Sequence, residues 1–417
     1  MIGLFLRFVQ AGISLRGASR VLALIIEALG LPFDAPHWTT GRLWLLRFGL
    51  AQLNAHKTKA SDWVWMIDHS VQIGPQKVLL IIGIRQEALP ERGQSLRLED
   101  MELIALESME SSTREDVADR LMEAANRTCV PRAIVNDQGS DLTGGVEIFQ
   151  KTHTKTLAIH DTKHKAACLL KARLERNPRW QSFATRVGQA RCAIQQTEQA
   201  PLVPPGPRPK SRFMNLGPQL KWATKVLAVV DHPPASVLAK TTPARLEEKL
   251  GWVREYREEL TEWAQWQTIV DETNALVASH GLDETTVTVL KQQLKKRLPP
   301  KQRTAGSRQL VKDLTKFVGE QASQVPKGER LPGSTEVLES CFGKYKALEK
   351  HHAKSGFTSL LLGIGALIGK VTTEAVGSAM RAIPAQDVRD WCEEHLGKTF
   401  FAQRRAAFAT QASAQQK

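Results

Sequence analysis

The fold is decided by the segment WVWMID, residues 63–68, in which five apolar residues lead directly to Asp68. A short run that is rich in aromatic and β-branched residues is typical of a buried strand. A second apolar run, KVLLIIGIR at residues 77–85, follows after the turn-forming pair Gly74-Pro75. The two runs are therefore predicted to pair as a β-hairpin.

Toward the C-terminus, strand and helix signals alternate in the way that an α/β fold requires. The predicted elements are a strand at 101–107, a helix that Thr113 caps and Pro131 ends, a strand at 133–136, a helix at 142–153 and a strand at 156–160. The resulting order β-β-β-α-β-α-β indicates a mixed sheet with helices packed against it.

The first sixty residues carry helix signals instead. Two helices are predicted, each with a capping residue before it and a glycine after it. The capping and stop residues are Ser14 and Gly30 for the first helix, and Thr39 or Thr40 and Gly49 for the second, which spans 41–48.

Two arginines, Arg42 and Arg47, lie on the second of these helices. Two short capped helices with basic residues on the second are typical of a helix-turn-helix reader of DNA. A plain helical hairpin would show the same pattern. We therefore take Arg42 and Arg47 as candidate DNA-binding residues.

Beyond residue 170 the strand pattern stops. A proline-rich basic connector at 201–210 precedes long helical stretches that carry tryptophans at helical spacing, which indicates core positions. The predicted regions are 1–60 (helix-turn-helix-like, DNA-binding), 61–170 (first part of the sheet domain), 171–330 (all-α insertion), 331–400 (second part of the sheet domain) and 401–417 (flexible tail).

The composition favours a polyanionic partner. Of 417 residues, 57 are Lys or Arg and 43 are Asp or Glu, so the formal net charge of +14 favours nucleic acid. The five scattered cysteines form no CxxC pair, which argues against zinc or a disulfide framework and favours a reducing cytoplasm. The apolar stretch at 357–368 is too short to span a bilayer, and no signal peptide is recognisable, so we expect no membrane association.

Three acidic residues lie where a nuclease would carry metal-bound carboxylates. Asp68 and Asp137 each close a strand-like run, and Glu339 lies in a helical segment at 334–346. Neighbouring strand ends are rigid and can present ligands side by side, and carboxylates suit Mg²⁺ or Mn²⁺. Phosphodiester transfer commonly uses two such ions. Taken singly, however, a strand-end Asp is more often a turn residue, and a helical Glu is usually solvated.

Taken together, three motifs resemble those of the D-D-E transposases of bacterial insertion sequences, which carry a retroviral-integrase-like RNase H core. The motifs are WMIDHS at 65–70, IVNDQGSDL at 134–142 and LESCFGKYK at 338–346. The resemblance implies that Asp68, Asp137 and Glu339 are catalytic and hold two Mg²⁺ or Mn²⁺ ions. It also implies that Lys346, on the helix face of Glu339, contacts donor DNA.

The resemblance further implies the fold and the activity. The fold would be an RNase H-like α/β core interrupted by the all-α insertion. The activity would be cleavage of double-stranded DNA at the ends of a mobile element and transfer of those ends into target DNA, by a homo-oligomer at the bacterial nucleoid. The long interval between Asp137 and Glu339 fits only those members that carry an insertion. Two other classes stay open: a non-catalytic DNA-binding relative, and a host RNase H-like nuclease.

Some residues compete for these roles. Glu336 lies three residues before Glu339 on nearly the same helix face and could replace it as a ligand. Asp141 could compete with Asp137, although it lies beyond the predicted strand. Lys163, just past the last predicted strand, is a candidate for contact with a DNA phosphate.

Overall fold

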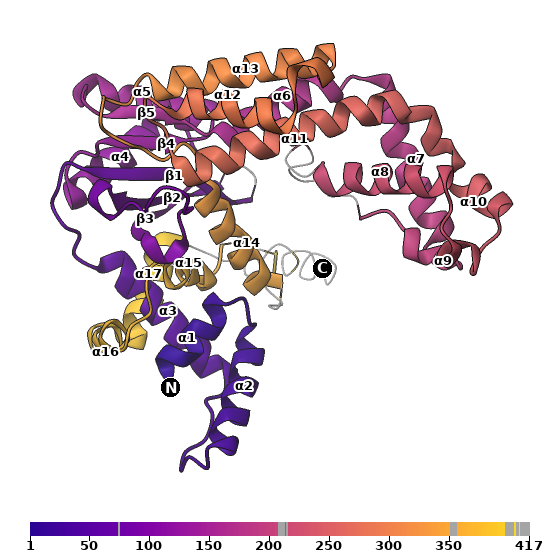
Figure 1. Ribbon diagram of the computed structural model, residues 1–417. Coiled ribbons are helices and arrows are strands. Elements are labelled where there is room, and N and C mark those ends of the chain that lie inside the picture. The colour runs from indigo at the N-terminus through magenta and orange to yellow at the C-terminus, as the bar shows by residue number, and fades with distance from the viewer. Residues whose placement is uncertain are drawn as a thin grey trace, which may run out of the picture. The chain divides into compact units, whose positions relative to one another are not determined.

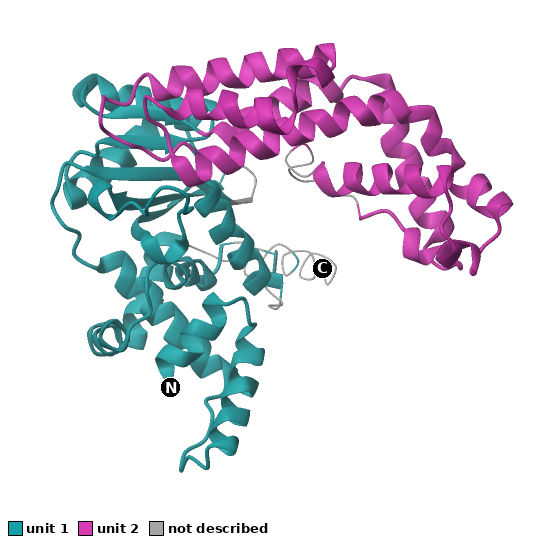
Figure 2. Ribbon diagram, viewed as in Figure 1, with its two compact units in different colours: residues 1–160, 334–417 teal, residues 161–333 magenta. Residues whose placement is uncertain are grey.

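The chain folds into two compact units, which Figure 2 distinguishes by colour. The computed structural model describes residues 1–73, 76–206, 213, 216–350, 357–396, 404, 405 and 408. Unit 1 comprises residues 1–160 and 334–417, and unit 2 comprises residues 161–333. Unit 2 therefore interrupts unit 1 in the sequence, and the first sixty residues belong to the same unit as the sheet.

A five-stranded mixed sheet of order β3-β2-β1-β4-β5 forms the centre of unit 1 (Figure 1). β2 pairs antiparallel with both β1 and β3, whereas β4 pairs parallel with both β1 and β5. The predicted α/β class and mixed sheet are thus confirmed. The strands are β1 (Trp63–Ile73), β2 (Gln76–Arg85), β3 (Glu102–Met109), β4 (Ala133–Asn136) and β5 (Leu157–His160).

Helices cover both faces of the sheet, which explains why the central strands are apolar throughout. α4 (Arg114–Thr128) and α5 (Ser140–Thr152) share a buried core with Trp63, Trp65 and Ile67 of β1. Alternation along the strand sends Val64 and Met66 to the other face, where α14 (Glu336–Lys350) packs against β1 and α3 (Trp38–Asn54) against β3.

The remaining elements of unit 1 are short. Two 3₁₀ turns lie between β2 and β3, one lies before α15, and the other helices come from the two ends of the chain. They are α1 (Ile2–Gln10), α2 (Leu15–Ala28), η1 (Gln86–Ala88), η2 (Leu98–Asp100), η7 (Ser359–Leu362), α15 (Gly363–Leu367), α16 (Thr373–Ala382) and α17 (Ala385–Leu396).

The predicted capping residues are correct in two of three cases. The Ser14 hydroxyl accepts a hydrogen bond from the Gly17 N–H at 3.1 Å and so caps α2, which ends just before Gly30 at a φ of +58°. Thr113 caps α4 in a capping box with Asp116. α3, in contrast, begins after His37, so Thr39 and Thr40 lie inside the helix.

The predicted end of that helix at Gly49 is also wrong. α3 continues to Asn54, and Gly49 is buried in its middle. A Cβ atom at Gly49 would overlap the Leu362 carbonyl oxygen of η7, and a Cβ atom at Gly365 of α15 would in turn meet the Gly49 backbone. Glycine is therefore required here because α3 packs tightly against the C-terminal segment, not because the helix ends.

The apolar stretch at 357–368 lies in this contact as well. Its leucines and isoleucines are buried, all but Ile368 within η7 and α15. Within the described ranges, none of the helices is both long enough and apolar enough to cross a lipid bilayer.

Unit 2 consists of helices in the part that the structure describes, apart from an isolated bridge between Leu282 and Leu331. Its elements are α6 (Thr162–Leu174), α7 (Pro178–Ile194), η3 (Ala200–Leu202), α8 (Gly217–Asp231), α9 (Ala235–Leu238), α10 (Pro243–Leu250), η5 (Gly251–Tyr256), α11 (Arg257–His280), α12 (Thr286–Arg297), η6 (Pro300–Gln302) and α13 (Ala305–Ala322).

Aromatic side chains form the core at one end of unit 2. The rings of Trp180 and Trp263 meet edge to face with centroids 4.9 Å apart, and Phe183 contacts both Trp263 and Tyr256. The prediction that these tryptophans are core residues is confirmed for Trp263 and Trp266, which are buried. Residues 207–210 of the predicted connector, the pair Gly74-Pro75 and almost all of the predicted tail lie outside the described residues.

Candidate active site at one edge of the sheet

The parallel pairing of β1 with β4 brings Asp68 and Asp137 to neighbouring positions. The last paired residues are Ile67 and Asn136, so the two aspartates follow in register. Neighbouring strands lie about 4.8 Å apart, which places the two residues side by side at this edge. Asp68 does not close β1, as predicted, because β1 continues to Ile73 through its pairing with β2. It lies instead where β4 stops and the strand loses one neighbour.

Both aspartates are half-buried and held by the local backbone. An Asp68 carboxylate oxygen accepts a hydrogen bond from the His69 N–H at 2.6 Å. Asp137 follows β4 and accepts from the Gly139 N–H at 2.8 Å, which closes the tight turn into α5. Each side chain therefore keeps one oxygen engaged with the backbone.

Glu339 lies on α14, whose start is held close to the same edge. The Thr162 N–H donates to the Gly333 carbonyl at 3.0 Å, so the first and last residues of unit 2 meet. Because His160 lies two residues before Thr162 and Ser334 directly follows Gly333, the end of β5 and the approach to α14 lie close together. α14 also packs against β1.

Burial distinguishes the two glutamates of α14. Glu339 is half-buried, whereas Glu336 is exposed. Lys346 is exposed two turns after Glu339, on the same side of the helix. A half-buried carboxylate next to a strand is better placed to act as a ligand, so Glu339 ranks before Glu336.

The three carboxylates are not gathered around one point. Among the residues that the structure describes, no group of three or more His, Cys, Asp or Glu is close enough to share a metal ion. The strand pairing therefore places Asp68 and Asp137 on neighbouring strands, but the structure does not bring the three carboxylates together as one metal-binding group.

Asp141, the competitor of Asp137, is anchored in a polar network that the sequence did not reveal. Its carboxylate accepts hydrogen bonds from Lys77 Nζ at 2.7 Å and from the Ser112 hydroxyl at 2.9 Å. The same hydroxyl lies 2.9 Å from Nε2 of His69, the residue after Asp68. The only sequence signal for this network was the polar pair that follows Asp68 in WMIDHS.

The network determines the protonation of its members. Partial burial alone would raise the pKa of Asp141, but the hydrogen bonds from Lys77 and Ser112 and the charge of His69 lower it to about 2. Burial lowers the pKa of His69 more than the nearby Asp141 raises it. Asp141 therefore serves as the charged partner of Lys77 and holds this loop beside Asp68.

Replacing Asp141 by Asn is expected to reduce the free energy of unfolding by about 2 kcal/mol at pH 7. The folded-state pKa is depressed from 3.8 to about 2, so the contribution is present above about pH 4 and lost as the pH falls toward 2. Urea unfolding of wild type and variant at several pH values measures this contribution to the free energy of unfolding. A deficit that does not shrink between pH 5 and about pH 3 would contradict the ionic origin, and the exposed Asp119→Asn variant is the control.

The two arginines of α3 make contacts inside unit 1. The Arg42 guanidinium donates to the Ser359 hydroxyl at 2.6 Å, and Arg47 donates to the carbonyls of Met380 and Ile383. These bonds tie α3 to the C-terminal helices and give both arginines a structural role. That they also contact DNA stays a prediction.

Lys163, the other candidate for DNA contact, lies in the first turn of α6 in unit 2. Its backbone N–H donates to the Asp161 carboxylate at 2.7 Å, and Asp161 thereby caps the helix. The predicted contact of its side chain with a phosphate stays a prediction.

A polar cavity of about 310 Å³ lies beside Asp137, on the α5 side of the sheet. His160 reaches it from β5 and bonds to the wholly buried Asn136 at 3.0 Å. The cavity is lined by Arg114, Gln138, Ser140, Thr143, Gly144, Glu147 and His160.

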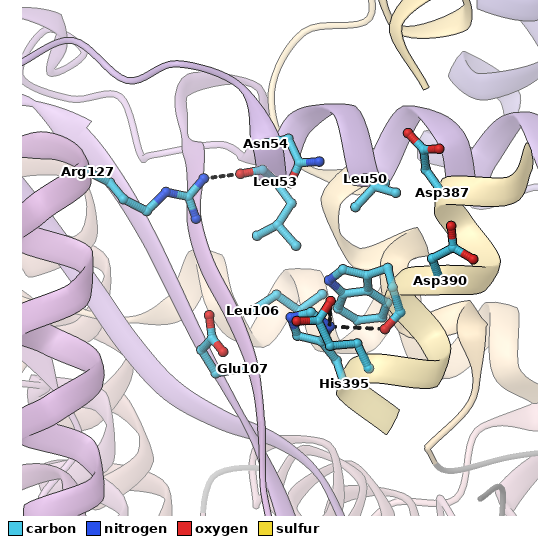
Figure 3. Close-up of a pocket in the computed structure, with 11 residues that line it drawn as sticks. Leu50, Leu53, Asn54, Leu106, Glu107, Arg127, Asp387, Asp390 and His395 are labelled. Carbon is cyan, nitrogen blue, oxygen red and sulfur yellow. Dashed lines mark hydrogen bonds and ion pairs between the residues drawn. The ribbon is translucent and has the colours of Figure 1, made fainter. Parts of the chain in front are cut away.

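A second cavity, of about 390 Å³, lies between α3, β3, α4 and α17 (Figure 3). Arg127 donates to the Leu53 carbonyl on one side, and His395 stacks on Trp391 on the other, with ring centroids 4.9 Å apart. Burial raises the pKa of Glu107, which lines the cavity from β3. None of the residues predicted for the active site lines this cavity.

Comparison with known proteins yields little. The chain matches no protein-family model and no curated protein. One solved structure to which it is similar is the Drosophila P element transposase strand transfer complex, at 12% sequence identity. The similarity covers 89% of this chain and 93% of that chain, with a TM-score of 0.38. At this TM-score the likeness supports no conclusion about fold or function.

Proposed function

We propose that this chain is a transposase of the D-D-E type that cleaves DNA at element ends and transfers the ends into target DNA. The observation that carries the proposal is the neighbouring placement of Asp68 and Asp137 across the parallel β1–β4 pair. The sheet supports it, because three antiparallel strands followed by two parallel ones in the order β3-β2-β1-β4-β5 agree with an RNase H-like core. Unit 2 would then be the insertion before Glu339.

The donor atoms suit Mg²⁺ or Mn²⁺, since all three carboxylates offer oxygen. Asp68, Asp137 and Glu339 would hold the ions, which would supply activation of the attacking oxygen and stabilisation of the leaving one. For a shared ion, the three carboxylates have to come closer together than they do in this structure. Glu339 lies on α14, which packs against β1, the strand that carries Asp68.

Double-stranded DNA is the substrate that the charge favours. The net charge of +14 supplies the electrostatic attraction to phosphates. Lys346, exposed on the Glu339 side of α14, would contact DNA near the site. If the proposal is correct, the protein nicks DNA only when Mg²⁺ or Mn²⁺ is present, and a chelator stops the nicking.

The paired variants Glu339→Gln and Glu336→Gln test the ligand on α14. Glu339→Gln is expected to reduce Mn²⁺-dependent nicking of a supercoiled plasmid by about 10³-fold, because a lost metal ligand costs several kcal/mol of transition-state stabilisation. Glu336→Gln, the same change on an exposed position of the same helix, is expected to stay within about threefold of wild type. A reversed pattern would give the role to Glu336, and unaffected nicking in both would exclude the helix from the site.

The lack of a three-carboxylate group among the described residues is the one observation that favours a second function, DNA binding without catalysis. Calorimetric titration of the full chain with Mn²⁺ distinguishes a transposase from a non-catalytic DNA-binding protein. Heat of binding that disappears in Asp68→Asn supports the transposase. Retention of plasmid DNA without Mn²⁺ binding supports the non-catalytic protein. Preferred cleavage of RNA–DNA hybrids would instead indicate a host nuclease.

A further inference from the structure

Exposed apolar side chains gather at the N-terminal end of the chain. Leu24 is 64% exposed and Leu29 is 67% exposed, although both are large aliphatic residues. Eight large apolar side chains are exposed among the described residues, and six of them belong to the first 33 residues: Met1, Leu4, Leu24, Leu29, Leu31 and Phe33. Such a concentration is unusual for a surface that faces only water.

α2 carries the centre of this surface. One side of the helix is buried against its neighbours through Leu15, Ala18, Leu22 and Ile26. Its other side exposes Leu24 between the small residues Ala23 and Ala28. Figure 1 shows α2 at the margin of unit 1, with its C-terminal end directed away from the sheet. The helix therefore has one buried apolar face and, on its other side, an exposed leucine with two alanines among charged residues.

Two opposite charges flank Leu24 on the exposed side. Arg20 lies one turn before it and Glu27 nearly one turn after it. Seven residues separate the two along the helix, about 10 Å, which is too far for an ion pair within α2. Neither side chain has an ion pair among the described residues of this chain.

This arrangement is complementary to itself. If two copies of α2 pack antiparallel with the two-fold axis between Ala23 and Leu24, Arg20 of each copy faces Glu27 of the other. The two Leu24 side chains then meet at the axis, and the alanines allow the helices to approach closely. A two-fold dimer requires a single patch of this kind.

We propose that the outer side of α2 is a self-association surface, on which two copies of this chain pair antiparallel about Leu24. The two charges favour a second copy of this chain as the binding partner, because a partner surface of a single charge sign would pair with only one of Arg20 and Glu27. The proposal does not depend on the activity of the carboxylates. The modest area of one helix face gives a dimer of micromolar rather than nanomolar affinity.

Sedimentation of the full chain over about 1–100 μM tests the proposal. Wild type is expected to shift from monomer to dimer across this range. Arg20→Glu and Glu27→Arg are each expected to weaken the dimer at least about tenfold, since each change sets two like charges against each other. The double variant R20E/E27R restores the attraction and is expected to return to within about threefold of wild type.

Controls keep the result specific. Lys225→Glu changes an exposed charge on α8 by the same amount as Arg20→Glu and is expected to leave the dimer unchanged. Leu24→Glu is expected to give a monomer with an unaltered circular dichroism spectrum, because Leu24 is outside the core. Three outcomes would overturn the proposal: a wild type that stays monomeric, a dimer that survives Leu24→Glu, and single variants that the double variant fails to rescue.

Discussion

Asp68→Asn and Asp137→Asn are each expected to reduce Mg²⁺-dependent DNA cleavage by at least about 10³-fold while DNA binding stays within about twofold of wild type. Asparagine has the shape of aspartate but lacks the negative charge that compensates the charge of a bound dication. Removing one of two neighbouring carboxylates leaves the ion with too little compensation to bind.

The fold is expected to survive both changes, because each asparagine keeps the side-chain oxygen that the backbone uses. In Asp137→Asn this oxygen still accepts from the Gly139 N–H and preserves the turn into α5. In Asp68→Asn it still accepts from the His69 N–H. Loss of cleavage without loss of melting temperature would therefore report on the metal and not on the structure.

Measurement should pair plasmid nicking with filter retention of the same DNA. Asp119→Asn, an exposed change on α4, serves as the control and is expected to cleave like wild type. Asp141→Asn is a closer control, because it makes the same substitution near the proposed site. Asp141 forms an ion pair with Lys77, so this variant is expected to retain most of the cleavage activity. Undiminished cleavage in Asp68→Asn or Asp137→Asn would falsify the proposed site.

Gly49→Ala is expected to destabilise unit 1 by at least about 3 kcal/mol, or to prevent its folding. The added methyl group would overlap the Leu362 carbonyl oxygen, which is backbone and cannot move aside without separating η7 from α3. Because α3, α15 and the 3₁₀ turn η7 pack together here, the strain would spread through the contact between the two ends of the chain.

Urea unfolding followed by circular dichroism measures this effect. Gly343→Ala on α14 is the matched control, because the added carbon would meet nothing within 4 Å beyond its own turn of helix. It is expected to stabilise the helix by about 1 kcal/mol, since alanine is the better helix former. Equal effects of the two substitutions would show that α3 and η7 are not packed as the structure has them.

The sequence by itself determined the features that depend on near neighbours. β4 was predicted with its observed bounds, 133–136, because a short apolar run that begins soon after Pro131 and ends at a polar turn has few alternatives. The caps at Ser14 and Thr113 were predicted because a cap satisfies backbone N–H groups within three residues. The order of strands and helices followed from such local signals.

The tertiary structure alone decided the features that depend on distant partners. Gly49 was predicted as a helix end, yet Leu362, more than three hundred residues later, explains it as a packing position. Asp68 was predicted as a strand end, yet pairing with β2 carries β1 on to Ile73. The role of Asp141 depends on Lys77 and Ser112, whose approach no local pattern indicates.

The site itself divides in the same way. Asp68 and Asp137 were found from the sequence because an acid that follows a buried run is a local pattern, but only the parallel β1–β4 pairing puts them side by side. Glu339 follows a 173-residue unit, and how near it comes to the two aspartates depends on how α14 packs, which spacing along the chain does not encode. Local hydrogen bonding and periodicity can be read from neighbouring residues, whereas the packing of remote segments is fixed only when the whole chain has folded.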